Sequence, residues 1–242
     1  MRKGLKFAIV ATINDPLLPL IIKNFLDLKI RPEFIICDSN EIDSKLVKCV
    51  HDRVGNYISL DSIYNIKPSL PFYFVDLHNS KYTCDFIKSK DVDILVNGGV
   101  NCILKNFIIN ATQGIISCHP GLIPDYRGCS NVEWAILNDD PVGNTVYLMS
   151  ERIDQGPILA QRALTFENET DYQSVRAKVY DDGFRLLAEV MRDVSMGILK
   201  TENAKAPGRK GNYYKNMPAD LVGEVKAKIK SKKYKFQYTR EE

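Results

Sequence analysis

The sequence predicts an α/β fold in which a mostly parallel, Rossmann-like sheet is flanked by helices and followed by a small C-terminal appendage. Two observations support this class. Hydrophobic residues make up 45% of the 242-residue chain, enough to fill a core. Short apolar runs alternate with longer amphipathic segments, which is the pattern of strand and helix in turn. Such alternation is typical of a parallel sheet covered by helices on both faces.

The first half of the chain supplies five expected strands, each a short apolar run with a helical pattern between it and the next. The expected strands are Phe7–Thr12, Phe34–Cys37, Phe72–Val75, Val92–Val96 and Gly114–Cys118. The expected helices are Leu17–Leu28, one capped near Asn40 that runs past Val50, Tyr82–Ser89 and a short one at Ile103–Phe107.

The second half begins with a loop at Pro120–Gly128, which is rich in proline and glycine. The elements expected after it are a helix at Ser130–Asn138, strands at Thr145–Met149 and Leu159–Phe166, a long helix at Asp171–Val194 and a last helix at Pro218–Lys230. The composition becomes basic and polar after Lys200. We therefore predict a main domain over residues 1–200 and a C-terminal extension over 201–242.

Charge and cysteine content favour a cytoplasmic protein. The net charge of +3 gives no strong case for a nucleic-acid or membrane partner. The lysines near the C-terminus are expected to form a solvated face, with an RNA or phosphate contact as the alternative. The six cysteines include no C-x-x-C pair, so we expect buried thiols in a reducing compartment. A zinc site at Cys49 and His51 lacks a second pair of ligands, and no metal is expected. No apolar run reaches the roughly 18 residues of a membrane-spanning helix.

Two polar residues follow expected strands at the edge where open parallel sheets bind ligands. His119 comes directly after the fifth strand, and Asp154 lies in the loop between the sixth and seventh. Ser117 stands two residues before His119 and should share its face of the sheet, whereas Cys118 should point to the other face. A carboxylate beside an imidazole favours the protonated ring and fixes its orientation. Such a pair can shuttle a proton or stabilise an oxyanion.

These residues lie in a longer pattern that resembles the folate-dependent formyltransferase family. The pattern is SCHPGLIPDYRG at residues 117–128, Trp-Ala-Ile at 134–136 and IDQGPIL at 153–159. That family includes methionyl-tRNA, glycinamide ribonucleotide and nucleotide-sugar N-formyltransferases. The resemblance covers roughly residues 5–200. It implies the formyltransferase fold, a formyl transfer to an amine and 10-formyltetrahydrofolate as the donor.

The resemblance also implies the site residues. The family's catalytic set is an Asn-x-His pair with a distant Asp, which His119 and Asp154 match, but Ser117 stands where the family has Asn. Ser117, a water molecule or another amide such as Asn131 could take over the missing donor. The donor-binding residues implied by the resemblance are Asn97, Gly98, Gly99, Val100, Leu104, Ile153 and Asp154. The residues expected to contact the acceptor are His78, Asn79, Tyr126, Arg127 and Asn131.

Other interpretations of these residues remain open. Gly98-Gly99 could be a plain turn, and His78-Asn79-Ser80 could be the N-cap of the next helix. Arg127 could hold an acceptor phosphate or form a surface salt bridge. Tyr213 and Tyr214 could stack on a base or sugar, or could serve packing.

The acceptor is the least determined part of the hypothesis, because specificity is a property of the site and not of the fold. The segment at residues 211–215 looks more like the sugar-pathway enzymes, so we favour a nucleotide-linked amino sugar. Too few residues follow Lys200 for the second domain of the methionyl-tRNA enzymes, and glycinamide ribonucleotide enzymes normally keep the Asn. A hydrolase without an amine acceptor and a folate-binding relative without catalysis are further alternatives. The sequence leaves a homodimer open.

Overall fold

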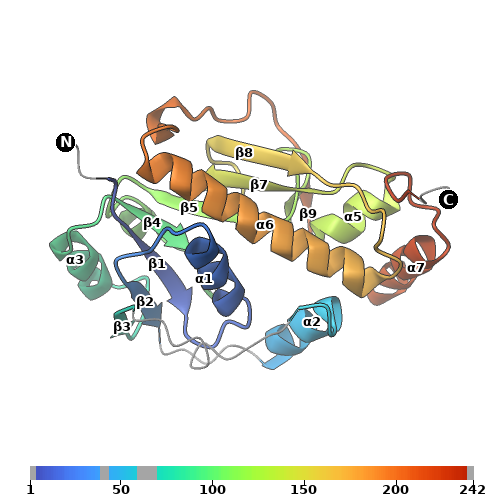
Figure 1. The fold of residues 1–242 in the computed structure, drawn as a ribbon, viewed down its shortest axis with the longest axis horizontal. Helices are drawn as coiled ribbons and strands as arrows, with labels where there is room; N and C mark the ends of the chain where they lie inside the picture. The colour runs from blue at the N-terminus through green and yellow to red at the C-terminus, as the bar shows by residue number, and fades with distance from the viewer. Residues whose placement is uncertain (1–3, 39–43, 59–69, 239–242) are drawn as a thin grey trace.

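The computed structural model describes residues 4–38, 44–58 and 70–238, and a seven-stranded sheet lies at its centre (Figure 1). The strand order is β3-β2-β1-β4-β5-β7-β8. The bounds are β1 Phe7–Thr12, β2 Ile35–Asp38, β3 Phe72–Val75, β4 Ile94–Asn97, β5 Ile115–His119, β7 Gly143–Leu148 and β8 Ile158–Ala163. The first five strands are parallel, whereas β7 and β8 are antiparallel. This arrangement confirms the predicted mostly parallel sheet.

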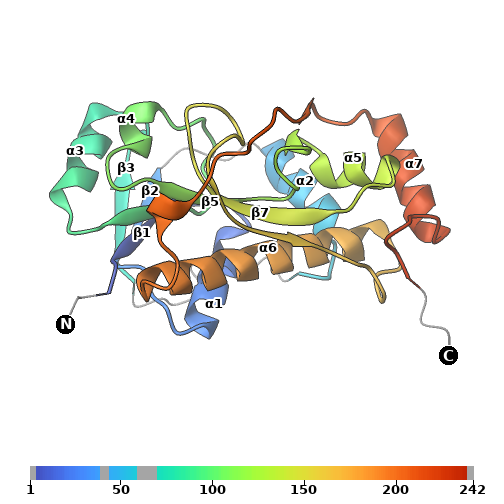
Figure 2. The same cartoon turned by 90° about the horizontal axis from the view of Figure 1, so that it is seen from above.

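Helices cover both faces of the sheet. Figure 2 shows α1 (Leu18–Asp27) and α6 (Tyr172–Ser195) below it, and α3 (Lys81–Ser89) and α4 (Asn106–Ile109) above it. The remaining helices are α2 Ser44–Val54, which packs on α6, α5 Asn131–Leu137, α7 Ala219–Lys230 and a 3₁₀ turn, η1, at Thr201–Asn203. Strand β1 is buried along its whole length because it has helices on both sides, which explains its unbroken apolar sequence.

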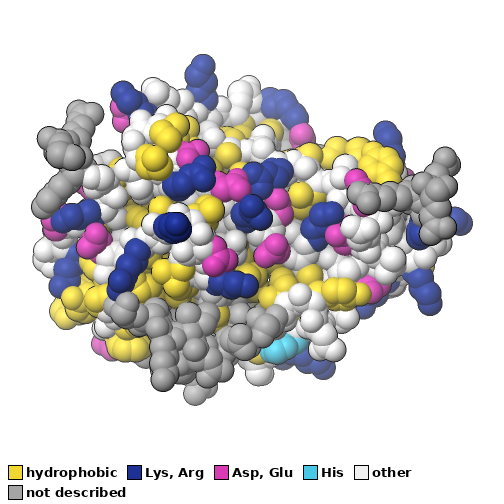
Figure 3. All heavy atoms as spheres, in the orientation of Figure 1, with side chains coloured by type: hydrophobic (Ala, Val, Ile, Leu, Met, Phe, Trp, Pro, Cys, Tyr) yellow, Lys and Arg dark blue, Asp and Glu magenta, His cyan; other side chains and the backbone are white. Residues whose placement is uncertain are grey.

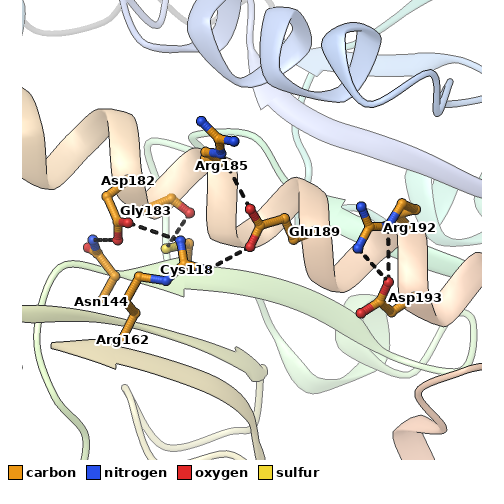
Figure 4. Close-up of polar contacts among 9 residues, drawn as sticks. All are labelled: Cys118, Asn144, Arg162, Asp182, Gly183, Arg185, Glu189, Arg192 and Asp193. Atoms are coloured by element: carbon orange, nitrogen blue, oxygen red, sulfur yellow. Dashed lines mark hydrogen bonds and ion pairs between the residues drawn. The ribbon is translucent and has the colours of Figure 1, made fainter.

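Helix α6 is fixed to the sheet by polar contacts as well as by its apolar side (Figure 4). Arg162 of β8 contacts Asp182 and Glu189 at 3.0 and 2.6 Å, and Asn144 of β7 donates to Asp182 at 2.9 Å. Over the face seen in Figure 3, acidic and basic side chains are intermixed. That face therefore presents no continuous field of one charge.

The C-terminal part of the chain returns to the middle of the molecule. The short strand β9 (Tyr213–Tyr214) pairs in parallel with β6 (Arg127–Gly128), and α7 packs against α5. One apolar core contains residues of the preceding part of the chain, beginning with Tyr126, together with residues of the tail. The tail residues in this core include Met217, Val225, Ile229 and Tyr234. The boundary at residue 200 stays a prediction, but the described tail residues share a core with the preceding ones.

Most expected elements are present, and several details differ. The short helix expected at residues 103–107 lies at α4, three residues later, and β6, β9 and η1 were not predicted. The helix start expected near Asn40 lies outside the described residues. The expectation of buried thiols is wrong for Cys102 and Cys129, which lie in exposed loops outside the core.

Neither a metal-ligand cluster nor a membrane-spanning helix is found among the residues that the structure describes. In the part of the chain that the structure describes, no group of three or more His, Cys, Asp or Glu side chains is arranged to hold a metal ion. None of the described helices combines the length and the apolar character needed to cross a bilayer.

Candidate active site

Strand β5 presents Ser117 and His119 on one face of the sheet and Cys118 on the other. The Cys118 thiol points to α6, where it donates to the carbonyl of Gly183 at 3.3 Å (Figure 4). Burial raises the pKa of this thiol. Both observations argue against a thiolate nucleophile at this position.

His119 lies at the carboxyl end of β5 and is buried. Its Nδ1 is 3.5 Å from Oδ2 of Asp154, and its Nε2 lies 2.9 Å from the carbonyl oxygen of Tyr126 and 3.0 Å from Nδ2 of Asn131. The ring can therefore be held in either neutral tautomer. A proton on Nε2 is donated to Tyr126, and with the proton on Nδ1 the Nε2 lone pair accepts from Asn131. This arrangement suits a group that gives and takes protons.

The loop after His119 allows this close contact because Gly121 has no side chain. A Cβ at that position would lie 2.5 Å from the Tyr126 carbonyl oxygen and 2.8 Å from His119 Nε2. The loop is also held by Thr145, whose hydroxyl donates to Gly121 and accepts from the amide of Ile123.

Asp154 is fixed by two donors from distant parts of the chain. The amide of Gly128 donates to its Oδ2 at 2.8 Å, and the hydroxyl of Tyr147 donates to its Oδ1 at 2.9 Å. Its φ of 53° lies in the left-handed region, which Asp tolerates better than most residues. The carboxylate is thus held in place beside His119.

Burial has the largest effect on the charge of His119. Burial lowers the pKa of the imidazole from its usual 6.5, and the opposing effects of Asp154 and the Tyr126 carbonyl do not compensate. Asp154 favours the protonated ring as predicted, but loss of solvent has the larger and opposite effect on the pKa of His119.

A chain of hydrogen bonds connects Asp154 with β4. The amide Nδ2 of Asn97 donates to the Ser117 hydroxyl at 3.1 Å. Ser117 in turn pairs across the strands with Tyr147 and hydrogen-bonds to its side chain. Burial, followed by the nearby Asp154, raises the pKa of Tyr147, so its hydroxyl keeps its proton and donates to Asp154.

A cavity of about 260 Å³ opens beside these residues. Ser117, His119, Tyr147 and Asp154 lie at one side of it, and the loop at residues 150–154 forms a wall. The apolar part of the lining consists of Val100, Ile103, Leu104, Met149 and Ile153. Ile103 is 70% exposed and Ile153 41%, so the cavity has apolar surface free to contact a flat ring system.

A second cavity of about 170 Å³ lies toward α1 and α6 and is mainly apolar. Its polar lining includes Asp15, Asn144 and Tyr180. Asp15 accepts from the amide of Leu17 at 2.8 Å, and burial raises the pKa of its carboxyl group. Asn97 and Cys118 contribute to the lining of both cavities.

The predicted donor residues separate into two groups. Asn97, Val100, Leu104, Ile153 and Asp154 line the larger cavity. Gly98 packs against Ile9, where a Cβ would lie 2.4 Å from its side chain, and Gly99 lies beside Asp15 in the second cavity with a φ of +98°. Close packing and a positive φ are thus the reasons for the two glycines in this structure.

Among the predicted acceptor residues, Asn131 touches His119, and the others make structural contacts. His78 is buried and hydrogen-bonds to the Ala11 carbonyl at 3.0 Å; Asn79 donates to Ile103. The N-cap of α3 is Ser80, from the same three-residue stretch. These contacts do not bring His78 or Asn79 into either cavity described above.

Tyr126 and Arg127 contact the tail. The Tyr126 hydroxyl donates to Asp140, and its ring stacks on Tyr214 at 5.1 Å, so Tyr214 serves packing while Tyr213 is exposed. Arg127 is buried and donates to the Gly211 carbonyl at 2.9 Å, in place of the surface salt bridge considered from the sequence.

Tyr147 is the residue of this site that the sequence did not single out. It lies within an expected strand and reads there as a core aromatic residue. Its position opposite Ser117 depends on the antiparallel register of β5 and β7, which no local pattern gives.

Comparison with known proteins bears directly on this site. Residues 76–191 match the family model described as Formyl transferase. The chain carries a formyl transferase domain. The matched residues include Asn97, Ser117, His119, Tyr147 and Asp154, so the whole hydrogen-bonded site lies within the formyl transferase domain.

Individual relatives agree with this family. The methionyl-tRNA formyltransferase of Caldanaerobacter subterraneus subsp. tengcongensis is 30% identical over 121 residues, which are 49% of this chain and 39% of that protein. The chain thus spans about two fifths of the length of this curated relative.

Solved structures of other proteins share the fold of this chain. A sugar N-formyltransferase from a Shewanella species superposes with a TM-score of 0.60 at 21% identity, over 87% of this chain and 76% of the other. Glycinamide ribonucleotide transformylase 1 from Symbiobacterium toebii gives 0.61 at 17% identity, over 88% and 96%. Both likenesses establish the formyltransferase fold.

Proposed function

We propose that this protein is an N-formyltransferase that moves the formyl group of 10-formyltetrahydrofolate to an amine. The observation that carries the proposal is the pair of His119 and Asp154 beside a cavity with apolar walls, together with a second cavity that shares Asn97 in its lining. A reaction between two bound molecules needs two adjoining spaces with proton-transfer groups at their border.

The donor would occupy the larger cavity. Its apolar side chains suit the faces of a flat heterocycle, and the polar backbone of the loop at residues 150–154 can pair with the edges of the ring. When bound, 10-formyltetrahydrofolate supplies an activated formyl carbon. The residues of the chain then provide orientation and proton transfer.

His119 and Asp154 have separate roles in this proposal. The transfer forms a bond between the amine nitrogen and the formyl carbon and breaks the bond from that carbon to the folate nitrogen. One proton leaves the amine and one reaches the folate nitrogen. His119, neutral in the free protein, can accept the first proton, and Asp154 then stabilises the charged ring and can let it release a proton to the leaving nitrogen.

The acceptor we propose is the amino group of a nucleotide-linked amino sugar. The second cavity is mostly apolar, and its polar lining includes the carboxyl group of Asp15 at the start of α1. This carboxyl group already accepts from the amide of Leu17, the N-cap of α1, at the helix end where a phosphate would otherwise bind. The cavity is therefore better suited to an amine-bearing sugar ring than to a phosphate. The likeness to a sugar N-formyltransferase supports the same class.

A donor-consumption assay tests this function. The protein is supplied with 10-formyltetrahydrofolate and one of several amines: nucleotide-linked 3-amino and 4-amino sugars, glycinamide ribonucleotide or methionyl-tRNA. The variants His119→Ala and Asp154→Ala are measured beside His51→Ala and Asp85→Ala, which remove the same side chains at exposed positions on α2 and α3.

We expect turnover with one amino sugar, a loss of at least about 100-fold in kcat for both site variants, and little change for both controls. Turnover with glycinamide ribonucleotide or methionyl-tRNA would replace the proposed acceptor and keep the reaction. Consumption of the donor without any amine would identify a hydrolase. Folate binding without turnover with any amine would contradict the proposed function.

A further inference from the structure

A carboxamide lies beside Ser117, on the neighbouring strand. Val96 of β4 pairs with Ile116 of β5, so the next residues along these parallel strands, Asn97 and Ser117, are side by side. The Nδ2 of Asn97 donates to the Ser117 hydroxyl at 3.1 Å. An amide is thus present close to the position where the formyltransferase family has its Asn, but it comes from β4.

The orientation of this amide is fixed at both ends. The backbone N–H of Gly99 lies 3.1 Å from Oδ1 of Asn97 and can donate only to that oxygen. The amide nitrogen must therefore face Ser117. The amide nitrogen carries two protons, and in the described contacts one of them is used by Ser117. The second N–H remains for a ligand.

Asn97 also lines the cavity that contains His119 and Asp154. Asn97 and Cys118 are the residues shared by the two cavities, and the Cys118 thiol is turned toward the Gly183 carbonyl. Of these two residues, Asn97 is the one with an N–H that the described contacts leave unused. A formyl group bound beside His119 would lie in the cavity that Asn97 lines.

We propose that Asn97 is a catalytic residue that donates a hydrogen bond to the formyl oxygen, in place of the family's Asn at position 117. This inference rests on the proposed formyl transfer. As the amine nitrogen bonds to the formyl carbon, the carbon–oxygen π pair moves to the oxygen, and the Asn97 N–H stabilises the negative charge until the pair returns and the bond to the folate nitrogen breaks. Ser117 is a positioning residue. Its hydroxyl accepts from Asn97, and it lies opposite Tyr147 on the neighbouring strand.

The test uses an exchange of the two polar groups. Asn97→Ala removes the donor, Asn97→Asp keeps an acceptor for the Gly99 amide without an N–H, and the double variant Asn97→Ser with Ser117→Asn places the carboxamide on β5 instead. Asn110→Ala removes the same side chain from an exposed position after α4. The kcat and the KM for the donor are measured for each variant, and thermal unfolding verifies the fold.

We expect Asn97→Ala and Asn97→Asp to lower kcat by about 10²–10³-fold with little change in KM, since an oxyanion donor acts in the transition state. The double variant should recover at least about tenfold of that loss, which a structural role of Asn97 alone would not explain. If the Asn97→Ala variant does not fold, the kcat of Asn97→Asp, whose side chain has a similar shape, tests the inference.

Retention of kcat within about threefold in Asn97→Asp, while His119→Ala is inactive, would overturn this inference and leave the proposed function standing. Failure of the double variant to exceed Asn97→Ala would also overturn it. Absence of turnover by the unaltered protein with every amine would overturn the proposed function and this inference with it.

Discussion

His119 is closed off from solvent at the end of β5, and this burial decides its charge in the protein alone. Its pKa lies below the usual 6.5, although Asp154 is 3.5 Å away. A neutral imidazole is ready to accept a proton, and the carboxylate limits the free energy of charging the ring once the proton arrives. The residue is therefore arranged as a proton acceptor in its resting state.

This lowered pKa predicts a pH dependence of stability. Below pH 6.5 the unfolded chain binds a proton at His119 before the folded protein does, so the free energy of unfolding falls as the pH falls toward the folded pKa. Well above pH 6.5 the ring is neutral in both the folded and the unfolded state, so this contribution to the pH dependence disappears. The variant His119→Gln should lose less thermal stability than the unaltered protein between about pH 7.5 and 5.5.

Differential scanning calorimetry at the two pH values measures the difference. The control is His51→Gln on α2, where the ring is exposed; it should follow the unaltered protein. An equal loss in His119→Gln and in His51→Gln would show that His119 does not contribute.

Helix α6 carries a buried ion pair near its N-terminal half. Arg176 lies 3.7 Å from Glu133 of α5, and the hydroxyl of Tyr172 donates to the same carboxylate at 2.6 Å. Burial alone would raise the pKa of Glu133, but Arg176 and Arg53 hold it below its usual value. Removal of Arg176 would leave this carboxylate buried with a weaker counter-charge.

We therefore expect Arg176→Met to lower the free energy of unfolding by about 3–5 kcal/mol. The matched variant Arg185→Met, on an exposed position of the same helix that pairs with Glu189, should change it by less than about 1 kcal/mol. Chemical denaturation measures both. A smaller effect for Arg176 than for Arg185 would contradict the interpretation of a buried pair.

At this scale the sequence predicted the regular elements well, because most of them have a clear period of their own. Strand β1 and strand β3 have the predicted bounds, and the long helix α6 is displaced by one residue. The two-residue strands β6 and β9 were missed because their pairing joins segments far apart in the chain and has no local signal. The antiparallel register of β5 and β7, on which the contact of Ser117 with Tyr147 depends, was missed for the same reason.

The site was predicted in the same uneven way. His119, Ser117 and Asp154 lie together as expected from strand ends and face alternation. His78, Asn79 and the glycine pair lie at the expected edge of the sheet, but their contacts are with the fold itself. A residue at the end of a predicted strand can be placed at an edge of the sheet from the sequence. Whether its side chain faces the cavity depends on tertiary packing, which the sequence pattern does not give.

At the scale of the whole molecule, the tail and the preceding residues share one apolar core. Tyr234 is fully buried, and its hydroxyl donates to the carbonyl of Asp140 at 2.7 Å. Its ring lies 6.1 Å from that of Phe166, which precedes α6. Unfolding of the tail should thus remove packing from the preceding residues, and the two should unfold together.

We expect Tyr234→Ala to lower the free energy of unfolding by about 3–5 kcal/mol, with a single cooperative transition in both the variant and the unaltered protein. Tyr238→Ala, where the ring is half exposed, should have a small effect. Calorimetry and denaturation followed by two spectroscopic probes measure this. Two separate transitions would contradict a shared core and support an independent extension.

Gly128 joins the tail to the centre of the site through main-chain atoms. Its N–H donates to Asp154, its carbonyl accepts from Asn131, and at a φ of +89° it pairs with Tyr214. On the Gly128 side these contacts use main-chain atoms, which a side-chain substitution at this position does not remove. The ¹⁵N-labelled amide of Gly128 would serve as a spectroscopic reporter, since its chemical shift senses the Asp154 carboxylate directly. A replacement of the tail that is meant to change substrate preference would need to keep Gly128 and its pairing with residue 214.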